Sequence, residues 1–165
     1  MAEFRITNEH SPSEVGNVID VLRRPRIWIP TQVDYPDHQV WLDKTEAQIA
    51  SGKKRAFLAY NGIEPIGSVV YQRHEQQPDV LEIRSISVVP ESNGRYVGSF
   101  ILRNTEIEGA ANDFPGVDTV MVDTKVSNTE MIDFLLKHGY VVVEITDLYQ
   151  QGAGLDAVLT KTLVV

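Results

Sequence analysis

The order of the predicted helices and strands restricts the fold of this 165-residue chain more than any other feature. Hydrophobic periodicity indicates a strand and two helices, three strands in succession, a helix and a strand, and finally a helix and two strands. Asn61-Gly62, between the second and third strands, is typical of a tight antiparallel hairpin. A strand that follows a strand–helix unit is expected to lie parallel to the strand before that helix. The sequence therefore predicts an α/β (α+β) fold with a mixed, mostly antiparallel sheet and a central β-α-β crossover.

Local signals give approximate bounds for these elements. Two capping boxes, Ser11–Glu14 and Ser127–Glu130, begin the first and last helices. The predicted helices run from Ser11 to Pro25, from about Asp37 to Ala50, from about Arg95 to Ala111, and from Ser127 to Gly139. The predicted strands are Phe4–Thr7, Arg55–Tyr60, Glu64–Tyr71, Val80–Val89, Thr119–Asp123, Tyr140–Thr146 and Asp156–Leu163.

Composition and charge exclude several classes of function. The chain has no cysteine, which excludes disulfides, thiolate nucleophiles and cysteine-based zinc sites, and its four histidines lack the spacing of metal ligands. A formal net charge of −8 argues against nucleic-acid binding. That charge is compatible with a cationic acceptor, although solubility alone explains it. We find no signal peptide and no apolar run that could span a membrane, so we expect a single cytoplasmic domain over residues 1–165.

The segment from Ser87 to Ser99 carries the clearest chemical signal. A strand leads into a loop of small polar residues, and a long helix begins where the loop ends. The first turn of a helix has unpaired N–H groups and a partial positive charge, and Gly94 and Gly98 would allow a ligand to approach the backbone. The segment is neither a Walker loop nor a dinucleotide fingerprint, because the required lysine and glycine spacing are missing. It therefore predicts a phosphate or pyrophosphate site.

This segment resembles motif A of the GNAT acetyltransferases, V-x-P-x-x-[QR]-x-x-G-x-[GA], with Val88, Pro90 and Gly98 in place. A later stretch, from Asn128 to Gly139-Tyr140, is similar to a second GNAT signature: an asparagine, an amphipathic helix and a glycine–aromatic pair. The order of elements agrees with the family over nearly the whole chain. The resemblance implies a GNAT-like sheet with a V-shaped splay between its two central strands.

The resemblance also implies an activity and a cofactor. A GNAT enzyme transfers the acetyl group of acetyl-CoA to a primary amine of a small molecule or protein. The pantetheine arm would enter the gap beside the strand ending at Val88-Val89, and an N–H near Val88 would stabilise the oxyanion. The implied coenzyme-binding residues are Val88, Val89, Asn93, Gly94, Arg95, Tyr96, Val97, Gly98, Ser99 and Asn128.

Three positions depart from the family pattern. Asn93 replaces the usual glutamine or arginine, and Tyr96 replaces the central glycine. Either the Tyr96 ring points outward and the amides still bind the pyrophosphate, or the site is weakened; we favour the first, because tyrosine permits helical dihedrals. Leu135 stands where the family often has a tyrosine that protonates the departing thiolate. No general acid is therefore visible at this position.

Two polar residues each have a functional and a structural interpretation. Glu82, six positions before Val88, matches the catalytic glutamate of the histone-acetylating GNAT branch and could act as the base, directly or through water. The structural interpretation is a solvated strand glutamate paired with a neighbouring strand. Asn128 could bind the coenzyme or cap the helix after it, a role shared with Ser127.

The acceptor and the partners are only partly predictable. Trp28, Tyr35 and Trp41, with His38 among them, occupy the loop where related enzymes receive acceptors, and we predict that the three aromatics bind substrate. Core packing explains at least one of the tryptophans equally well. The final strand, ending at Thr162–Val165, could be an exposed edge that pairs with a second copy in a homodimer.

Two further hypotheses compete with an active N-acetyltransferase. The departures at Tyr96 and Leu135 favour a catalytically weak or inactive GNAT-fold module that binds acyl-CoA or a protein partner. An unrelated α/β nucleotide-binding protein would instead have a continuous parallel sheet without a splay.

Overall fold

The computed structural model describes residues 4–7, 11–24, 37–92, 94, 96–149 and 154–164. Its helices and strands follow the predicted order, and all seven strands form one sheet in the order β1-β2-β3-β4-β5-β7-β6. The strands are β1 (Phe4–Thr7), β2 (Arg55–Asn61), β3 (Glu64–Arg73), β4 (Val80–Val88), β5 (Thr119–Lys125), β6 (Val141–Thr146) and β7 (Asp156–Thr162). The helices are α1 (Pro12–Arg23), α2 (His38–Ala50), α3 (Val97–Asn104) and α4 (Thr129–Lys137), with a 3-10 turn at Pro90–Ser92 and a π-helical continuation of α3 over Thr105–Asp113.

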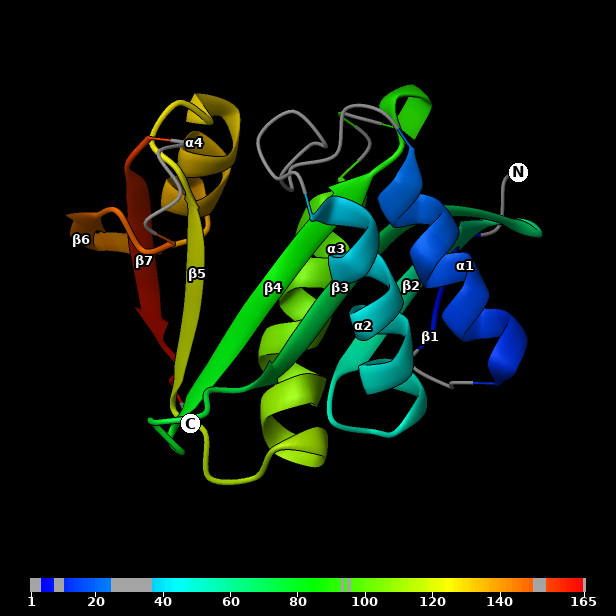
Figure 1. The fold of residues 1–165 in the computed structure, drawn as a ribbon, viewed down its shortest axis with the longest axis horizontal. Helices are drawn as coiled ribbons and strands as arrows, with labels where there is room; N and C mark the ends of the chain where they lie inside the picture. Colours follow the sequence, from blue (N-terminus) through cyan, green and yellow to red (C-terminus); the bar gives the residue numbers. More distant parts are fainter. Residues whose placement is uncertain are drawn as a thin grey trace.

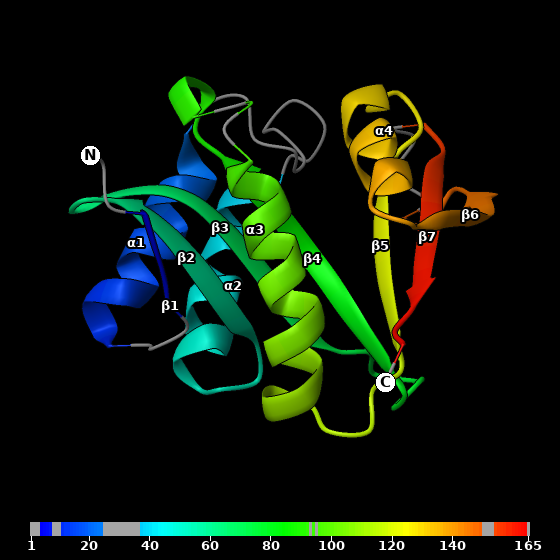
Figure 2. The same ribbon diagram turned by 180° about the vertical axis from the view of Figure 1, so that it is seen from behind.

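The helices cover the two faces of the sheet separately. Helices α1 and α2 lie on one face, and α3 and α4 lie on the other (Figures 1 and 2). Each face has its own core because strand side chains alternate between faces. Val70 of β3 packs with α1 and α2, whereas its neighbours Val69 and Tyr71 pack with α3 and its continuation.

Capping and periodicity explain where α1 forms. The Ser11 side chain accepts a hydrogen bond from the Glu14 N–H at 3.3 Å, and proline occupies the first helical position, as the capping box predicts. The helix buries its predicted apolar stripe against α2 and the sheet. That stripe consists of Val15, Val18, Ile19 and Leu22.

A glycine allows the π-helical continuation of α3 to lie close to the sheet. A Cβ at Gly109 would lie 2.9 Å from Cε2 of Tyr71, so a larger residue here would force the helix outward. The Tyr71 hydroxyl donates to Asp113 at 2.5 Å and so ties the last turn to β3. The continuation reaches Asp113, beyond the predicted end near Ala111.

The two central strands pair at only one end and then part. Strands β4 and β5 are parallel, as predicted, and pair at four positions, from Val80–Thr119 to Ile83–Val122. Beyond these, β4 continues on β3 and β5 continues on β7, so the two strands form the arms of a V (Figure 1). The predicted GNAT-like splay is therefore present.

A β-bulge lies where the strands part. Ile83 and Ser85 pair with the consecutive residues Tyr71 and Val70 of β3, so Arg84 is the extra residue of β4. Bulges reorient side chains and are frequent beside active sites. Arg84 lies on the α2 face of the sheet, the same side as Glu82 two residues earlier, and both side chains line a pocket there.

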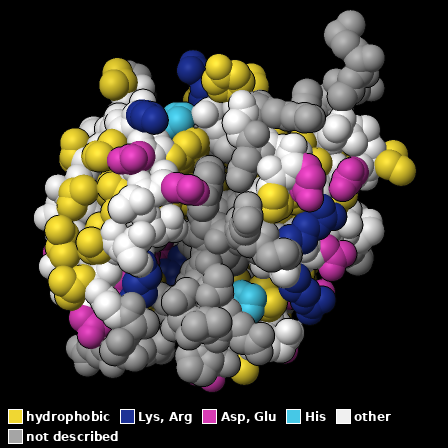
Figure 3. Space-filling view, turned by 90° about the horizontal axis from the view of Figure 1, so that it is seen from above, with side chains coloured by type: hydrophobic (Ala, Val, Ile, Leu, Met, Phe, Trp, Pro, Cys, Tyr) yellow, Lys and Arg dark blue, Asp and Glu magenta, His cyan; other side chains and the backbone are white. Residues whose placement is uncertain are grey.

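The last two strands do not lie in the sheet as expected. The final strand is not an edge: β7 lies between β5 and β6, and β6 forms the edge. The burial of the strands gives the physical reason, because Ala157, Val158 and Leu159 of β7 are buried whereas β6 is mostly exposed. Hydrophobic side chains gather on the side of the molecule where β6 lies (Figure 3). At this end of the sheet, pairing with a second copy would therefore involve β6 and not β7.

No helix among the described residues is both long enough and apolar enough to cross a bilayer.

Candidate active site between strands β4 and β5

The gap between the strands exposes backbone groups of β4. The Val89 N–H donates to the Ile66 carbonyl at 2.8 Å and therefore points toward β3. Because backbone groups alternate along a strand, the N–H and C=O of Val88 and Ile86 point toward the gap. Among the described strand pairs, β5 gives no partner to the part of β4 beyond Ile83. An extended ligand in the gap could pair with these groups as a further strand would.

The α3 helix begins beside the same gap with free amides. Its first backbone bond runs from the Phe100 N–H to the Tyr96 carbonyl at 3.0 Å, which leaves the N–H groups of Val97, Gly98 and Ser99 without an intrahelical partner. No described side chain caps this end. The free amides and the helix dipole favour an anion here. Asn93 and Arg95, also predicted to bind coenzyme, lie outside the described residues.

The backbone of Tyr96 differs from the expectation. Tyr96 is the N-cap of α3 and has φ 62° and ψ 7°, the left-handed region that favours glycine. Tyr96 therefore does not adopt the helical dihedrals that we expected for it; it adopts a conformation that glycine would take without strain. The side chain is 75% exposed, so the ring points away from the protein.

Close packing fixes the start of α3 on the sheet. A Cβ at Gly67 of β3 would lie 3.1 Å from both the Ser87 carbonyl oxygen and Cγ1 of Val97. Glycine thus lets the first turn of α3 sit directly over the end of β4, with Val97 buried in the core. The sequence analysis did not single out Gly67.

A histidine bridges the helices on either side of the gap. His138 Nδ1 lies 2.7 Å from the Phe134 carbonyl oxygen, and Nε2 lies 2.9 Å from the Ser99 hydroxyl. Because a carbonyl only accepts, Nδ1 donates to the Phe134 carbonyl, and Nε2 is the nitrogen that contacts the Ser99 hydroxyl. This contact leaves the backbone N–H of Ser99 free for a ligand.

Asn128 caps α4. Its Oδ1 accepts from the Met131 N–H at 3.3 Å, and its Nδ2 lies 3.2 Å from Oγ1 of Thr124 on β5. The N-cap is Asn128, one residue later than the capping box with Ser127 predicts. Its role in coenzyme binding stays a prediction.

Glu82 is a buried, fixed carboxylate. It is 7% exposed, with Oε2 accepting from Gln72 Nε2 at 2.8 Å and Oε1 paired with the Arg84 guanidinium. It is therefore not a solvated strand residue, although it does pair with the neighbouring strand.

A second carboxylate, Asp123, lies across the gap on β5. Strand alternation places it on the same face as Glu82 and Arg84, because its neighbours Val122 and Thr124 are buried on the other side. The Tyr149 hydroxyl donates to its Oδ2 at 2.7 Å. Burial raises the pKa of Asp123, while the Tyr149 hydrogen bond and the Arg84 charge oppose that rise.

Sequence reasoning missed Asp123 and Tyr149. The position of Asp123 at the predicted end of a strand is itself a signal, because Asp123 directly follows Val122, the last residue of β5 that pairs with β4, and so lies at the start of the splay. Tyr149 carried no comparable signal, since its contact with Asp123 depends on how the β6–β7 connection folds back.

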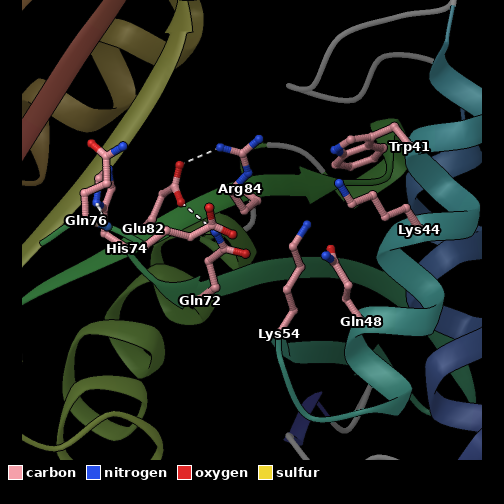
Figure 4. Close-up of a pocket in the computed structure, with 10 residues that line it drawn as sticks. Trp41, Lys44, Gln48, Lys54, Gln72, His74, Gln76, Glu82 and Arg84 are labelled. Carbon is pink, nitrogen blue, oxygen red and sulfur yellow. Dashed lines mark hydrogen bonds and ion pairs between the residues drawn. The ribbon is translucent and has the colours of Figure 1, made fainter. Parts of the chain in front are cut away.

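A pocket of about 340 Å³ lies on the α2 face of the sheet beside this cluster. Figure 4 shows side chains from α2, β3 and β4 surrounding it, with Glu82 held between Gln72 and Arg84. Its lining residues are Trp41, Lys44, Gln48, Lys54, Gln72, His74, Glu75, Gln76, Glu82 and Arg84. The predicted acceptor residue Trp41 is among them and stacks with His38 at 6.1 Å. Trp28 and Tyr35 lie outside the described residues.

A mixed sheet that opens between two parallel central strands, beside an uncapped helix start, is the architecture of the GNAT class of acyltransferase folds. The Acetyltransferase (GNAT) family model matches residues 21–140, and the chain belongs to this family. No curated protein sequence matches the chain.

Solved structures with low sequence identity share the fold. A GNAT-family protein from Desulfovibrio desulfuricans is 12% identical with a TM-score of 0.79, and the match covers 98% of this chain and 100% of that one. The ribosomal-protein-S18-alanine N-acetyltransferase of Escherichia coli is 14% identical with a TM-score of 0.71, covering 99% and 96%. An aminoglycoside 6'-N-acetyltransferase complexed with coenzyme A is also 14% identical, with a TM-score of 0.71 and 98% of each chain covered.

Proposed function

We propose that this protein is an N-acetyltransferase that transfers the acetyl group of acetyl-CoA to a primary amine. The observation that carries the proposal is the gap between β4 and β5, which begins after Ile83 and Val122 and leaves backbone groups of β4 unpaired. Family membership supports acyl transfer in general, and the coenzyme A complex of a structural relative supports an acyl-CoA as the donor.

The residues present fit a diphosphate and a pantetheine arm. The free N–H groups of Val97, Gly98 and Ser99 would bind the diphosphate. Backbone groups of Val88 and Ile86 would hold the arm along β4, and the Val88 N–H would also bind the thioester oxygen as negative charge develops there. Acetyl-CoA supplies an acyl group activated as a thioester.

The acceptor amine must lose a proton before it can react, because an ammonium is not a nucleophile. Two carboxylates flank Arg84. Both oxygens of the predicted base Glu82 are engaged, so it would act through water. Asp123 is better placed, because within the described part of the chain its Oδ1 has no partner and burial raises its pKa. We therefore propose Asp123 as the base and Glu82 as its alternative.

A second candidate is a module that binds acyl-CoA without turnover. Leu135, at the position where relatives often have a tyrosine acid, is fully buried in the core and cannot be approached by a leaving group. Transfer can still proceed, since a thiolate is a tolerable leaving group. This alternative predicts coenzyme binding and no thiol release.

Thiol release from acetyl-CoA, measured across a panel of amines, distinguishes an active N-acetyltransferase from a module that binds acyl-CoA without turnover. The panel should include amino acids, peptides with free N-termini, lysine side-chain analogues and polyamines. We expect acceptor-dependent release of coenzyme A with at least one class. Coenzyme binding without release by any class would favour the non-catalytic module, and the absence of both would reject an acyl-CoA function.

A further inference from the structure

The pocket beside the proposed reaction site is basic, although the chain as a whole carries a formal net charge of −8. Three of its lining residues are cationic: Lys44, Lys54 and Arg84. The two lining carboxylates already have partners, because Glu82 pairs with Arg84, and the exposed Glu75 pairs with Lys53 at 3.2 Å. Among the described residues, the pocket therefore has no free carboxylate to bind a cationic group.

Lys54 is the clearest unmatched charge. It is 5% exposed, yet within the described part of the chain its ammonium makes no hydrogen bond or ion pair. Burial, followed by repulsion from Arg84, lowers the pKa of Lys54 to about 8. A buried cation without a partner is costly, and a ligand carrying negative charge would remove that cost.

Arg84 adds donors directed at the same space. Its guanidinium makes one described ion pair, with Glu82, which leaves further N–H groups without a protein partner in the described residues. Figure 4 shows Lys54, in the segment before β2, extending toward the space that Arg84 and Lys44 also face. An arginine and a lysine at one site are a typical arrangement for a carboxylate or a phosphate.

Two side chains of the pocket, His74 and Gln48, add hydrogen-bonding groups to the cationic ones. His74 Nδ1 accepts from the N–H groups of Gln76 and Gln77 at 3.2 and 3.1 Å, so its remaining hydrogen is on Nε2 and can be donated. Gln48 Oε1 is buried, has no partner among the described residues and can accept a hydrogen bond. The pocket thus offers several donors for an anion and one unused acceptor.

The position of Arg84 places this pocket beside Asp123, the proposed base. Arg84 lies at the bulge where β4 leaves β5, and its charge acts on Asp123 across the gap. A ligand whose anionic group contacts Lys54 and Arg84 would therefore lie beside the carboxylate proposed to receive the proton of the amine.

We infer that the acceptor is an amine that also carries an anionic group, a carboxylate or a phosphate, and that Lys54 and Arg84 bind this group. The inference rests on the proposed transferase function and narrows its substrate class. It also implies that the acidity of the whole chain does not select a cationic acceptor such as a polyamine.

The test compares acceptors that differ only in charge. Thiol release from acetyl-CoA is measured with amino acids, with their carboxamides, with O-phosphoethanolamine and with polyamines. We expect kcat/KM to be at least about tenfold higher for an amino acid than for its carboxamide, as expected for one charged hydrogen bond. A higher kcat/KM with O-phosphoethanolamine than with amino acids would identify phosphate as the preferred anionic group. Equal or better turnover of carboxamides or polyamines would overturn the inference and leave the transferase function intact.

Single substitutions of lysines test whether Lys54 binds the anionic group of the acceptor. Lys54→Gln should raise the KM of the preferred anionic acceptor about tenfold while the KM of acetyl-CoA stays unchanged. Lys137→Gln removes an exposed lysine in the last turn of α4, which does not line the pocket, and should change neither value. If no amine is turned over, calorimetric titration of the protein with the same amino acids and O-phosphoethanolamine gives a second readout. Binding that weakens in Lys54→Gln would support the inference, and no binding would reject it. Failure of the transferase proposal shows separately, either as the absence of acetyl-CoA binding or as acetyl-CoA binding without thiol release by any amine.

Discussion

The Tyr149 hydroxyl donates a hydrogen bond of 2.7 Å to Oδ2 of Asp123, and this contact joins the β6–β7 connection to the strand that borders the gap. It orients the carboxylate while leaving Oδ1 without a partner in the described structure. Burial raises the pKa of Asp123 and the Tyr149 hydrogen bond lowers it. In the proposed reaction, Asp123 would therefore be a base whose pKa depends on Tyr149.

Asp123→Asn tests the assignment of the base. We expect kcat to fall about 100-fold, because the amide cannot take up the proton, while the KM of acetyl-CoA and the melting temperature change little. Glu82→Gln should lower kcat less than about tenfold, since Glu82 acts mainly by holding Arg84. Steady-state kinetics with a saturating acceptor measure both effects. The opposite ranking would assign the base to Glu82, as the sequence resemblance implies.

Tyr149→Phe should change the pH dependence. Loss of the hydroxyl removes a contact that lowers the pKa of Asp123, so this pKa rises further. A base with a higher pKa is protonated at higher pH, and the acidic limb of the kcat/KM profile should move to higher pH. Tyr140→Phe is the matched control, because that hydroxyl donates to Glu106 at 2.9 Å, among residues outside the proposed site. An unchanged limb in Tyr149→Phe would show that Asp123 is not the titrating base.

Lys54→Met should stabilise the fold near neutral pH. The pKa of Lys54 is lowered from 10.5 to about 8, so between these values the unfolded chain binds more protons than the folded protein. The free energy of unfolding of the wild type therefore rises with pH across this window, as the penalty of the buried charge disappears. We expect the gain of Lys54→Met to be at most about 3 kcal/mol at pH 7, less where water reaches the amine, and to shrink as the pH rises above about 8.

Urea denaturation at about pH 7 and about pH 10 measures this dependence. Lys53→Met is the control, because Lys53 is exposed and its loss should change stability by less than about 1 kcal/mol. A Lys54→Met variant that is less stable than the wild type at neutral pH would show that the ammonium has a partner in the folded protein.

Tyr96→Gly should relieve backbone strain. A left-handed conformation costs a non-glycine residue about 1–2 kcal/mol, and the greater freedom of glycine in the unfolded chain offsets part of the gain. We expect a net stabilisation of about 0.5–1 kcal/mol, measured as an increase in melting temperature of about 1–4 °C. Tyr96→Ala keeps the Cβ and should show no such gain. Because the ring is exposed, coenzyme affinity should stay within about threefold in both variants; a large loss would mean that the ring contacts the ligand.

Most of the fold was predictable because local signals agreed with one another. The Asn61-Gly62 hairpin, the cap at Ser11 and the strand–helix–strand order each determine a local geometry with few alternatives, and together they give the observed topology. The edge of the sheet was not predictable, because it depends on whether β6 or β7 pairs with β5. That choice follows from side-chain burial, which the periodicity of either strand alone does not specify.

The site was predictable where it depends on the backbone and less so where it depends on side chains. The α3 N-terminus and the splay follow from the segment ending at Val88 and from the crossover. The conformation of Tyr96 did not follow, because the left-handed backbone is imposed by the turn and not by the residue. The pocket charges were also not visible, since Lys54 and Arg84 are far apart in the sequence and meet only through the sheet.

Binding of the coenzyme at the α3 N-terminus and in the gap is the central claim, and isothermal titration with coenzyme A and with pantetheine tests it most directly. We predict that coenzyme A binds at one site and that pantetheine, which lacks the diphosphate, binds at least about tenfold more weakly, because it loses the free amides of Val97, Gly98 and Ser99. Equal affinity for the two compounds, or no binding of coenzyme A at high micromolar concentration, would contradict the account.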